Sequence, residues 1–180
     1  FISIFGKESQ SIISPAKSMD FEPASQNIGA SCVKASENMD VVLKGLKSLS
    51  VAQIAKLMKV STKIAELNYQ RFQDFEKSPE KQAIFAYSGD VYKNIDVENF
   101  SASQLNFAQK HLRIISALYG LVLPLDKIKA YRFEMSCRLP GACKGPVSEF
   151  WKNYVTMELN AELLNHKNKY LINLASNEYF

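Results

Sequence analysis

Residues 9–17 read SQSIISPAK, a short apolar run that ends in serine, proline, alanine and lysine. The run predicts a β-strand that ends at Ser14. The apolar runs QAIFAY (82–87) and KYLINLAS (169–176) predict further strands, and QAIFAY is apolar enough to be buried on both faces of a sheet. Helical segments separate these runs. The sequence therefore indicates the α/β class, with a mixed, partly parallel sheet and surrounding helices.

Serine residues mark the starts of the predicted helices, because a serine side chain can accept a hydrogen bond from a free N–H group of the first turn. Helices are predicted at 37–46 after Ser36, at 51–59 after Ser50, at 62–75 after Ser61, and after Ser101 and Ser148. Gln53 and Gln104 complete two capping boxes. The expected apolar face of the last helix consists of Phe150, Tyr154, Met157, Ala161 and Leu164. The run RIISALYGLVL (113–123) fits either a helix end or a strand.

The composition is that of an ordinary globular protein, with 47% hydrophobic and 22% charged residues among 180. This length suffices for one domain, 1–180, with a hydrophobic core. The net charge of +4 is mildly basic, which nucleic-acid-binding proteins share with many others. Three cysteines without a C-x-x-C pair favour neither a disulfide framework nor a zinc site, and free thiols fit a reducing cytoplasm. No apolar run approaches the length that spans a membrane.

Polar residues follow each predicted strand, at Ser14–Lys17, Ser88–Asp90 and Ser176–Glu178. If the strands are parallel neighbours, these ends share one edge of the sheet, where ligand sites of α/β proteins collect. The carboxylates of Asp90 and Glu178, with Asp20, could bind a metal ion there, or could cap helices and form ion pairs.

Ser14 and Lys17 have the S-x-x-K spacing of serine acyl-enzymes, in which the lysine helps to deprotonate the serine. That chemistry requires Ser14 on the first turn of a helix, with Lys17 on the same face. The partner motifs K-T-G and S-D-N are absent from the sequence. We therefore expect Ser14 to close a turn after the strand rather than to act as a nucleophile.

The two helices predicted after Ser50 and Ser61 form a helical hairpin, which is a candidate helix-hairpin-helix element at 50–75. In DNA-binding hairpins of this kind, the turn and the N-terminus of the second helix present N–H groups to a phosphate. Here the turn KVSTK offers Lys59, Ser61, Thr62 and Lys63, but no glycine. The alternative is a hairpin that only packs on the core.

Two arginines occur in apolar surroundings, where an unpaired charge is costly. Arg132 can form a structural ion pair with Glu134. Arg113 and Arg132 could instead line a basic cleft.

Six motifs in the same order resemble the YaaA family of bacterial peroxide-stress proteins. They are ISPAK (13–17), GDVY (89–92), FAQKHLRIISALYG (107–120), PLD (124–126), YRFEM (131–135) and NLASNEYF (173–180). The resemblance covers nearly the whole chain from Ile13 onward. It implies a YaaA-type α/β fold that continues beyond Phe180.

The resemblance also implies a function. Proteins of this family are cytoplasmic, bind double-stranded DNA through a positively charged cleft, and limit oxidative damage linked to intracellular iron. Their helix-hairpin-helix element matches 54–68, and no catalytic residue, cofactor or membrane association carries over. The expected DNA contacts are Lys17, Lys59, Ser61, Thr62, Lys63, Arg113 and Arg132.

Two other functions remain open from the residues. One is an enzyme with a pocket at the strand ends, formed by Lys17, Asp90 and Glu178. The other is an interaction module that affects iron only through protein partners. A broad positive groove would favour DNA, whereas a small pocket of mixed charge would favour catalysis.

Overall fold

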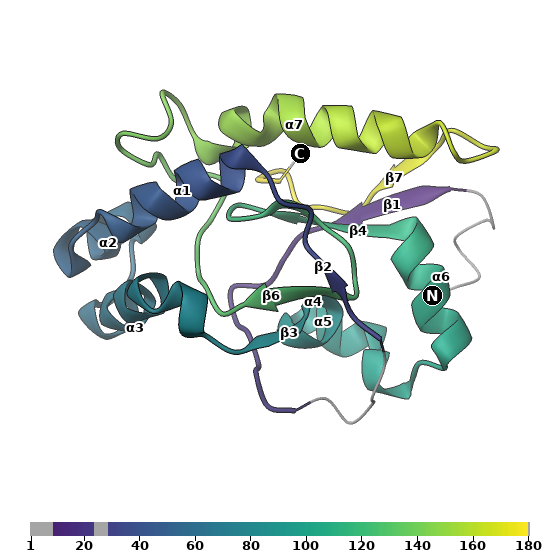
Figure 1. Ribbon diagram of the computed structural model, residues 1–180, viewed down its shortest axis with the longest axis horizontal. Coiled ribbons are helices and arrows are strands. Elements are labelled where there is room, and N and C mark those ends of the chain that lie inside the picture. Colours follow the sequence, from purple (N-terminus) through teal and green to yellow (C-terminus); the bar gives the residue numbers. More distant parts are fainter. Residues whose placement is uncertain (1–8, 24–28, 180) are drawn as a thin grey trace.

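The computed structural model describes residues 9–23 and 29–179 and contains two mixed β-sheets with helices around them (Figure 1). The strands of the first sheet are β1 (Gln10–Ile13), β4 (Leu112–Ser116), β5 (Gly120–Val122) and β7 (Leu171–Asn173). The strands of the second sheet are β2 (Ser31–Cys32), β3 (Glu80–Gln82) and β6 (Asp126–Lys129). The mixed α/β class is confirmed, although we expected one sheet rather than two.

The helices surround the sheets. They are α1 (Glu37–Lys47), α2 (Val51–Met58), α3 (Thr62–Gln73), α4 (Ala83–Ala86), α5 (Asp90–Ile95), α6 (Ala102–His111) and α7 (Val147–Leu163), with 3-10 turns η1 (Phe75–Lys77) and η2 (Val97–Asn99). Helix α7 runs along the first sheet, whereas α1, α2 and α3 gather at the opposite end of the molecule from α6 (Figure 1). Among the residues that the structure describes, no helix combines the length and the apolar character needed to cross a bilayer.

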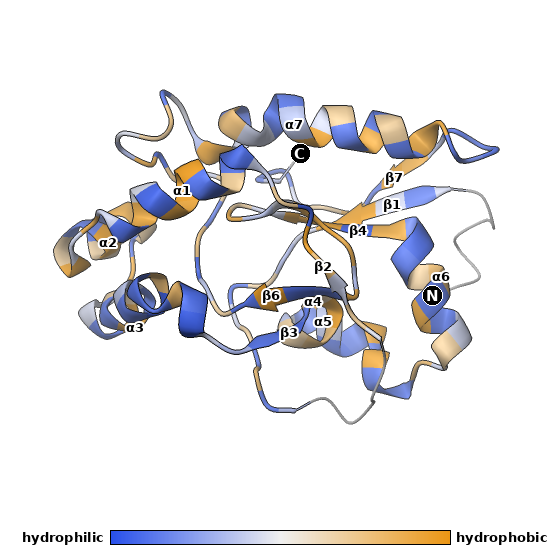
Figure 2. Ribbon diagram, viewed as in Figure 1, coloured by the Kyte–Doolittle hydropathy of each residue, from blue (hydrophilic) through white to orange (hydrophobic). Residues whose placement is uncertain are grey.

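The first sheet has the strand order β5-β4-β1-β7. Strands β4 and β7 both run parallel to the central β1, and β5 runs antiparallel to β4. Each residue of β1 and β4 is buried, as expected for strands covered on both faces. In Figure 2, the end of β1 has the orange colour of hydrophobic residues. The carboxyl ends of β1, β4 and β7 therefore meet at one edge of the sheet, and their amino ends meet at the other.

The predicted serine caps are confirmed for four helices. The Ser36 hydroxyl accepts a hydrogen bond from the Met39 N–H, and Ser61 does the same for the Ile64 N–H. Ser50 and Ser101 form complete capping boxes with the glutamines three residues further on. These contacts are local in sequence, so residue spacing alone predicts them.

The prediction of a strand over 82–87 is wrong. Strand β3 ends at Gln82, and Ala83–Ala86 form the single buried helical turn α4. The N–H of Ile84 donates to the carbonyl of Pro124, 2.9 Å away. A short run that is buried on all sides has no polar face, so its periodicity cannot distinguish strand from helix.

The start of α7 also differs from the prediction. Pro146 is the N-cap, and the backbone N–H of Ser148 donates to Met135 across the chain. The expected apolar face is rotated as well, since Met157 and Leu164 are 58% and 70% exposed. The buried residues of α7 are Val147, Trp151 and Leu159.

The ambiguous run 113–123 forms β4 and β5, joined by a tight turn. The preceding helix α6 ends at His111, and its C-cap Leu112 has already adopted extended backbone angles. Helix and strand thus follow one another without a loop.

Candidate nucleic-acid interface

Ser14 ends strand β1 as predicted and ties it to the end of β7. Its hydroxyl accepts from the N–H of Ser176 at 2.9 Å, and the two hydroxyl oxygens are 3.2 Å apart. The hydroxyl of Tyr92 donates to the Ser14 carbonyl at 2.8 Å. Residues 14–17 form no helix, so the S-x-x-K pair lacks the geometry that an acyl-enzyme requires. Ser14 closes a turn between neighbouring strands.

The third predicted strand end, Ser88–Asp90, lies at the same edge, although it does not follow a strand. No strand precedes Asp90, which is instead the first residue of α5, after the N-cap Gly89. Gly89 lies so close to the first segment that an added Cβ would come within 3.1 Å of the Ala16 Cβ. The edge is thus built from the loops after β1 and β7 and from the start of α5.

The candidate metal ligands Asp20, Asp90 and Glu178 do not form a cluster in the structure. The Asp20 carboxylate accepts from the Glu22 N–H in its own loop, and Glu178 accepts from both the N–H and the hydroxyl of Ser136. Within residues 9–23 and 29–179, no group of three or more histidine, cysteine or acidic side chains could hold a metal ion.

Lys17 and Arg132 share one carboxylate at this edge. The Lys17 ammonium lies 3.3 Å from Glu134 Oε1, and Arg132 Nη2 lies 3.6 Å from the same oxygen. The predicted ion pair between Arg132 and Glu134 is confirmed, and Lys17 joins it. Arg132 Nε is buried without a hydrogen-bond partner, whereas the Lys17 side chain is 58% exposed. Lys17 therefore remains accessible to an anion in solution.

A group of buried tyrosines supports this edge from below. The Tyr131 hydroxyl lies 2.8 Å from that of Tyr87 and 2.6 Å from that of Ser116 at the end of β4. Burial raises the pKa of Tyr131 to about 12 and raises the pKa of Tyr87 and Tyr179 as well. These phenols stay neutral at physiological pH. The sequence analysis did not identify these tyrosines as part of the site. The one indication in the sequence was Tyr131, the first residue of the YRFEM motif.

Cys137 connects the strand ends to the helical hairpin. Its thiol lies 3.6 Å from the carbonyl of Leu57, in the last turn of α2. Burial raises the pKa of this thiol, and the charges of Glu134 and Glu178 act in the same direction. Cys137 is therefore a protonated packing residue rather than a nucleophile. The contact brings the C-terminal end of α2 next to the segment that carries Arg132 and Glu134.

The hairpin turn presents the predicted residues to solvent. Helix α2 ends at Met58, α3 begins at Thr62, and the two helices pack against each other. Lys59, Ser61, Thr62 and Lys63 are all exposed. Lys56, which the sequence analysis did not single out, is exposed in the last turn of α2 and adds a third lysine.

Lys59 adopts the left-handed conformation, with φ at 51°. The N–H of Val60 then returns to the Ala55 carbonyl at 3.1 Å and closes the helix end. Glycine is the usual residue at such a position, because a side chain costs about 1–2 kcal/mol there. A strained lysine at an exposed turn is a reason to suspect a function.

Replacing Lys59 with glycine should raise the free energy of unfolding by about 0.5–1 kcal/mol, since glycine accepts the positive φ without steric cost. Urea unfolding followed by circular dichroism measures this change. The matched control is Lys56→Gly, which places glycine inside α2 and should lower stability by about 1 kcal/mol. A Lys59→Gly variant that is as destabilised as the control would show that the left-handed cap is not strained.

Arg113 does not belong to this edge, which corrects our expectation. It lies at the start of β4 and is buried, and its Nε atom donates to Glu162 Oε2 at 2.7 Å. Its Nη1 atom donates to the carbonyls of Gln109 and Leu112. The apolar surroundings were visible in the sequence, but the partner on α7, 49 residues away, was not.

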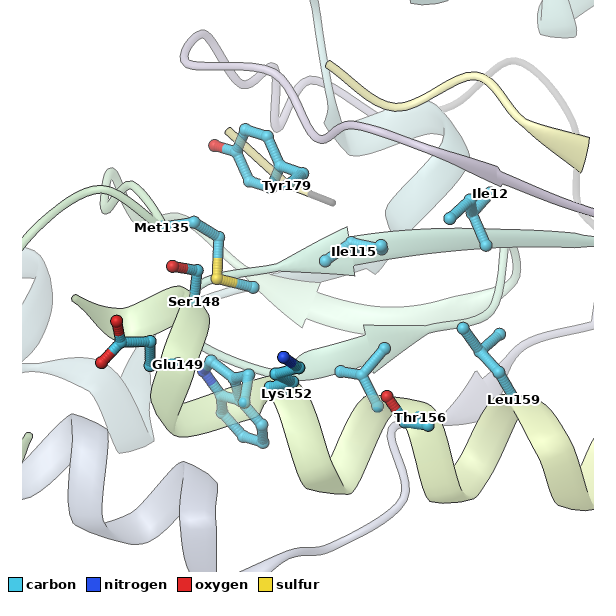
Figure 3. Close-up of a pocket in the computed structure, with 11 residues that line it drawn as sticks. Ile12, Ile115, Met135, Ser148, Glu149, Lys152, Thr156, Leu159 and Tyr179 are labelled. Carbon is cyan, nitrogen blue, oxygen red and sulfur yellow. The ribbon is translucent and has the colours of Figure 1, made fainter. Parts of the chain in front are cut away.

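An apolar cavity of about 490 Å³ lies between α7 and the first sheet (Figure 3). Ile12 and Ile115 face it from the sheet, and Leu159 faces it from the helix. The other lining residues are Met135, Ser148, Glu149, Trp151, Lys152, Val155, Thr156 and Tyr179. None of the residues expected in a strand-end pocket, Lys17, Asp90 and Glu178, lines this cavity.

Comparison with known proteins gives consistent matches. Residues 10–180 match the model of a family described as peroxide stress protein YaaA. A UPF0246 protein of Rickettsia bellii is 45% identical over 168 residues, which cover 93% of this chain and 67% of the relative. UPF0246 proteins of Rickettsia felis and Shewanella loihica are 44% and 43% identical, over 93% and 94% of this chain and 66% and 67% of their own lengths. The chain thus spans about two thirds of these relatives.

Proposed function

Since the chain belongs to the peroxide stress protein YaaA family, we propose that it binds double-stranded DNA in the cytoplasm and so limits peroxide damage linked to intracellular iron. The helical hairpin 50–75 acts as a helix-hairpin-helix element, and its turn contacts the DNA backbone. Binding requires no catalytic residue and no cofactor.

The left-handed Lys59 in the hairpin turn is the main support for this proposal. Lys59 and Lys63 lie on either side of the N-terminus of α3, where the N–H groups of the first turn carry a partial positive charge. The hydroxyls of Ser61 and Thr62 are exposed beside them. Together, these ammonium, N–H and hydroxyl groups can donate hydrogen bonds to the oxygens of a phosphate.

Lys17 and Arg132 extend this basic surface from the strand ends. Cys137 links the two regions through its contact with the last turn of α2. Glu134 partly neutralises both cations in the free protein. A phosphate close to Lys17 would compete with Glu134 for its ammonium group. Contacts of this kind recognise the DNA backbone and not the base sequence.

Fluorescence anisotropy with random-sequence duplex DNA, measured over a series of salt concentrations, tests the proposal. Contacts from Lys17, Lys59, Lys63 and Arg132 should give a slope of log affinity against log salt of about −3.6, or about −0.9 for each phosphate contact. Duplexes of different sequence should bind equally well. A slope close to zero, or no binding, would contradict the proposal.

Catalysis at the strand ends is the second candidate function. It is favoured by the mixed charge there, with Lys17 and Arg132 close to Glu134 and with Glu178 held on Ser136. Arg132 Nε is buried and has no hydrogen-bond partner among the described residues, so a small substrate could accept a hydrogen bond from it.

The variant Glu178→Gln separates the two functions. If the protein acts through DNA, removing this negative charge should leave duplex affinity equal or slightly higher, and cells should survive peroxide as with the wild-type protein. Survival assays and anisotropy measure these two properties. A folded variant that keeps DNA binding but loses protection would favour catalysis with Glu178 as a participant.

A further inference from the structure

Strand β7 forms an open edge of the first sheet. It lies beside β1 and pairs with β1 alone among the described strands (Figure 1). The Leu174 N–H donates to the Ile12 carbonyl of β1 at 2.9 Å. Because every second residue of a strand bonds to the same neighbour, Leu171 and Asn173 turn their backbone N–H and C=O groups away from β1. Within residues 9–23 and 29–179, no partner binds these outward groups.

Apolar side chains are exposed along this edge. Tyr170 and Leu174 are 71% and 50% exposed. They share one face of the strand with Ile172, because successive side chains point to opposite faces. On the other face, Leu171 packs against the hydrophobic core. An exposed apolar strand with unpaired backbone groups is a template for pairing with a further strand.

The apolar cavity beside α7 extends to the strand next to this edge. Ile12 of β1 lines the cavity and is the register partner of Asn173 in β7. Leu159 faces the same cavity from α7 (Figure 3). Trp151 packs α7 on Gly120 of β5, which is the edge strand opposite to β7. Helix α7 therefore covers the sheet at β5, and an apolar cavity remains at β1, next to β7.

The related proteins contain polypeptide that is available to cover this edge. Those from Rickettsia bellii, Rickettsia felis and Shewanella loihica have about a third of their length outside the region that matches this chain. A second copy of the chain fits less well. Strand β7 has only 3 residues, so a pair of such strands is a small contact beside the roughly 1,000 Å² that a specific interface buries. A second β7 would also leave the cavity beside α7 unfilled.

We propose that β7 pairs with a further β-strand from this outside third of the family's sequence, and that the same segment fills the cavity beside α7. The added strand bonds to the outward N–H and C=O groups of Leu171 and Asn173. It has apolar side chains on both faces, because one face continues the row of Tyr170, Ile172 and Leu174 and the other face lies on the side of the cavity. DNA binding is not required for this pairing.

Mixing the 1–180 chain with the part of the Rickettsia bellii relative outside the 168 matched residues tests this pairing. Titration calorimetry measures binding, and amide hydrogen exchange followed by NMR measures the protection of the Leu171 and Asn173 N–H groups. In the chain alone, these two amides should exchange as fast as those of exposed loops. With the added polypeptide at saturation, we expect their exchange to slow by about tenfold or more.

Leu174→Glu places a charge in the apolar row beside the added strand and should weaken binding about tenfold. The matched control is Met157→Glu, which changes a residue of α7 that is 58% exposed and does not line the cavity, and binding should stay unchanged. The proposal is overturned if nothing binds, if the Leu171 and Asn173 amides exchange equally fast with and without the added polypeptide, or if Leu174→Glu binds as tightly as the control. It is also overturned if the chain alone forms a dimer that protects these two amides, because β7 would then pair with a second copy.

Discussion

Gly120→Ala should lower the free energy of unfolding by about 2–5 kcal/mol, a large part of the stability of a domain of this size. Gly120 has φ at +79°, a conformation that costs a side chain about 1–2 kcal/mol. An added Cβ would also lie 2.5 Å from Trp151 Cζ3 and 2.6 Å from Trp151 Cε3. Overpacking of this kind costs about 1–3 kcal/mol. Chemical and thermal unfolding followed by circular dichroism measure the loss.

Trp151 cannot move aside easily. Its side chain is 1% exposed, and its indole N–H donates to the Ala117 carbonyl at 2.9 Å, in the turn between β4 and β5. The indole therefore anchors α7 on the first sheet, and Gly120 leaves the space that it occupies. The substitution has to displace the helix or the turn.

Gly141→Ala separates the two contributions. Gly141 has nearly the same φ, +76°, but an added Cβ meets no atom within 4 Å. This variant should lose only about 1–2 kcal/mol, the cost of the backbone conformation. If Gly120→Ala is no more destabilising than Gly141→Ala, the close packing of Trp151 on Gly120 is not a feature of the protein.

The elements that the sequence predicts correctly are those fixed by local contacts. Ser36, Ser50, Ser61 and Ser101 each accept from an N–H three residues further on, and a spacing of three can be read directly. The strand that ends at Ser14 was likewise clear, because a turn residue follows an apolar run.

The elements that the sequence does not predict depend on distant partners. Strand β3 consists of the polar residues Glu80–Gln82, and only its pairing with β6, more than 40 residues away, makes it a strand. The following run 83–86 is helical and buried on all sides, so its sequence has no alternation of polar and apolar residues that would distinguish a helix from a strand. The second sheet could not be predicted, because it depends on the pairing of β3 with β6.

The candidate site shows the same division. The edge shared by Ser14 and Ser176 could be expected from the polar residues that follow two strands. Arg113 could not be placed, because its role depends on Glu162 of α7. The link between Cys137 and the hairpin also joins segments that are 80 residues apart. Hydrogen-bond partners this distant leave no periodic signal in the chain.

The double substitution Lys59→Gln, Lys63→Gln should weaken the binding of every duplex alike. Both side chains are exposed, so the fold should be retained. Each lost phosphate contact removes about 0.9 from the salt slope, so the slope of log affinity against log salt should flatten by about 1.8. The affinity at low salt should fall most, because electrostatic contacts are least screened there.

The matched control is Lys127→Gln, Lys169→Gln, which removes two exposed lysines from β6 and from the segment before β7. It has the same change in net charge and should keep the slope within about half a unit. The decisive measurement is therefore the salt dependence of duplex DNA affinity for the wild-type protein and these two variants. We expect a slope that is reduced by about 1.8 only in the Lys59, Lys63 variant. An unchanged slope in that variant, with a reduced slope in the control, would show that the hairpin only packs on the core and that DNA binds elsewhere.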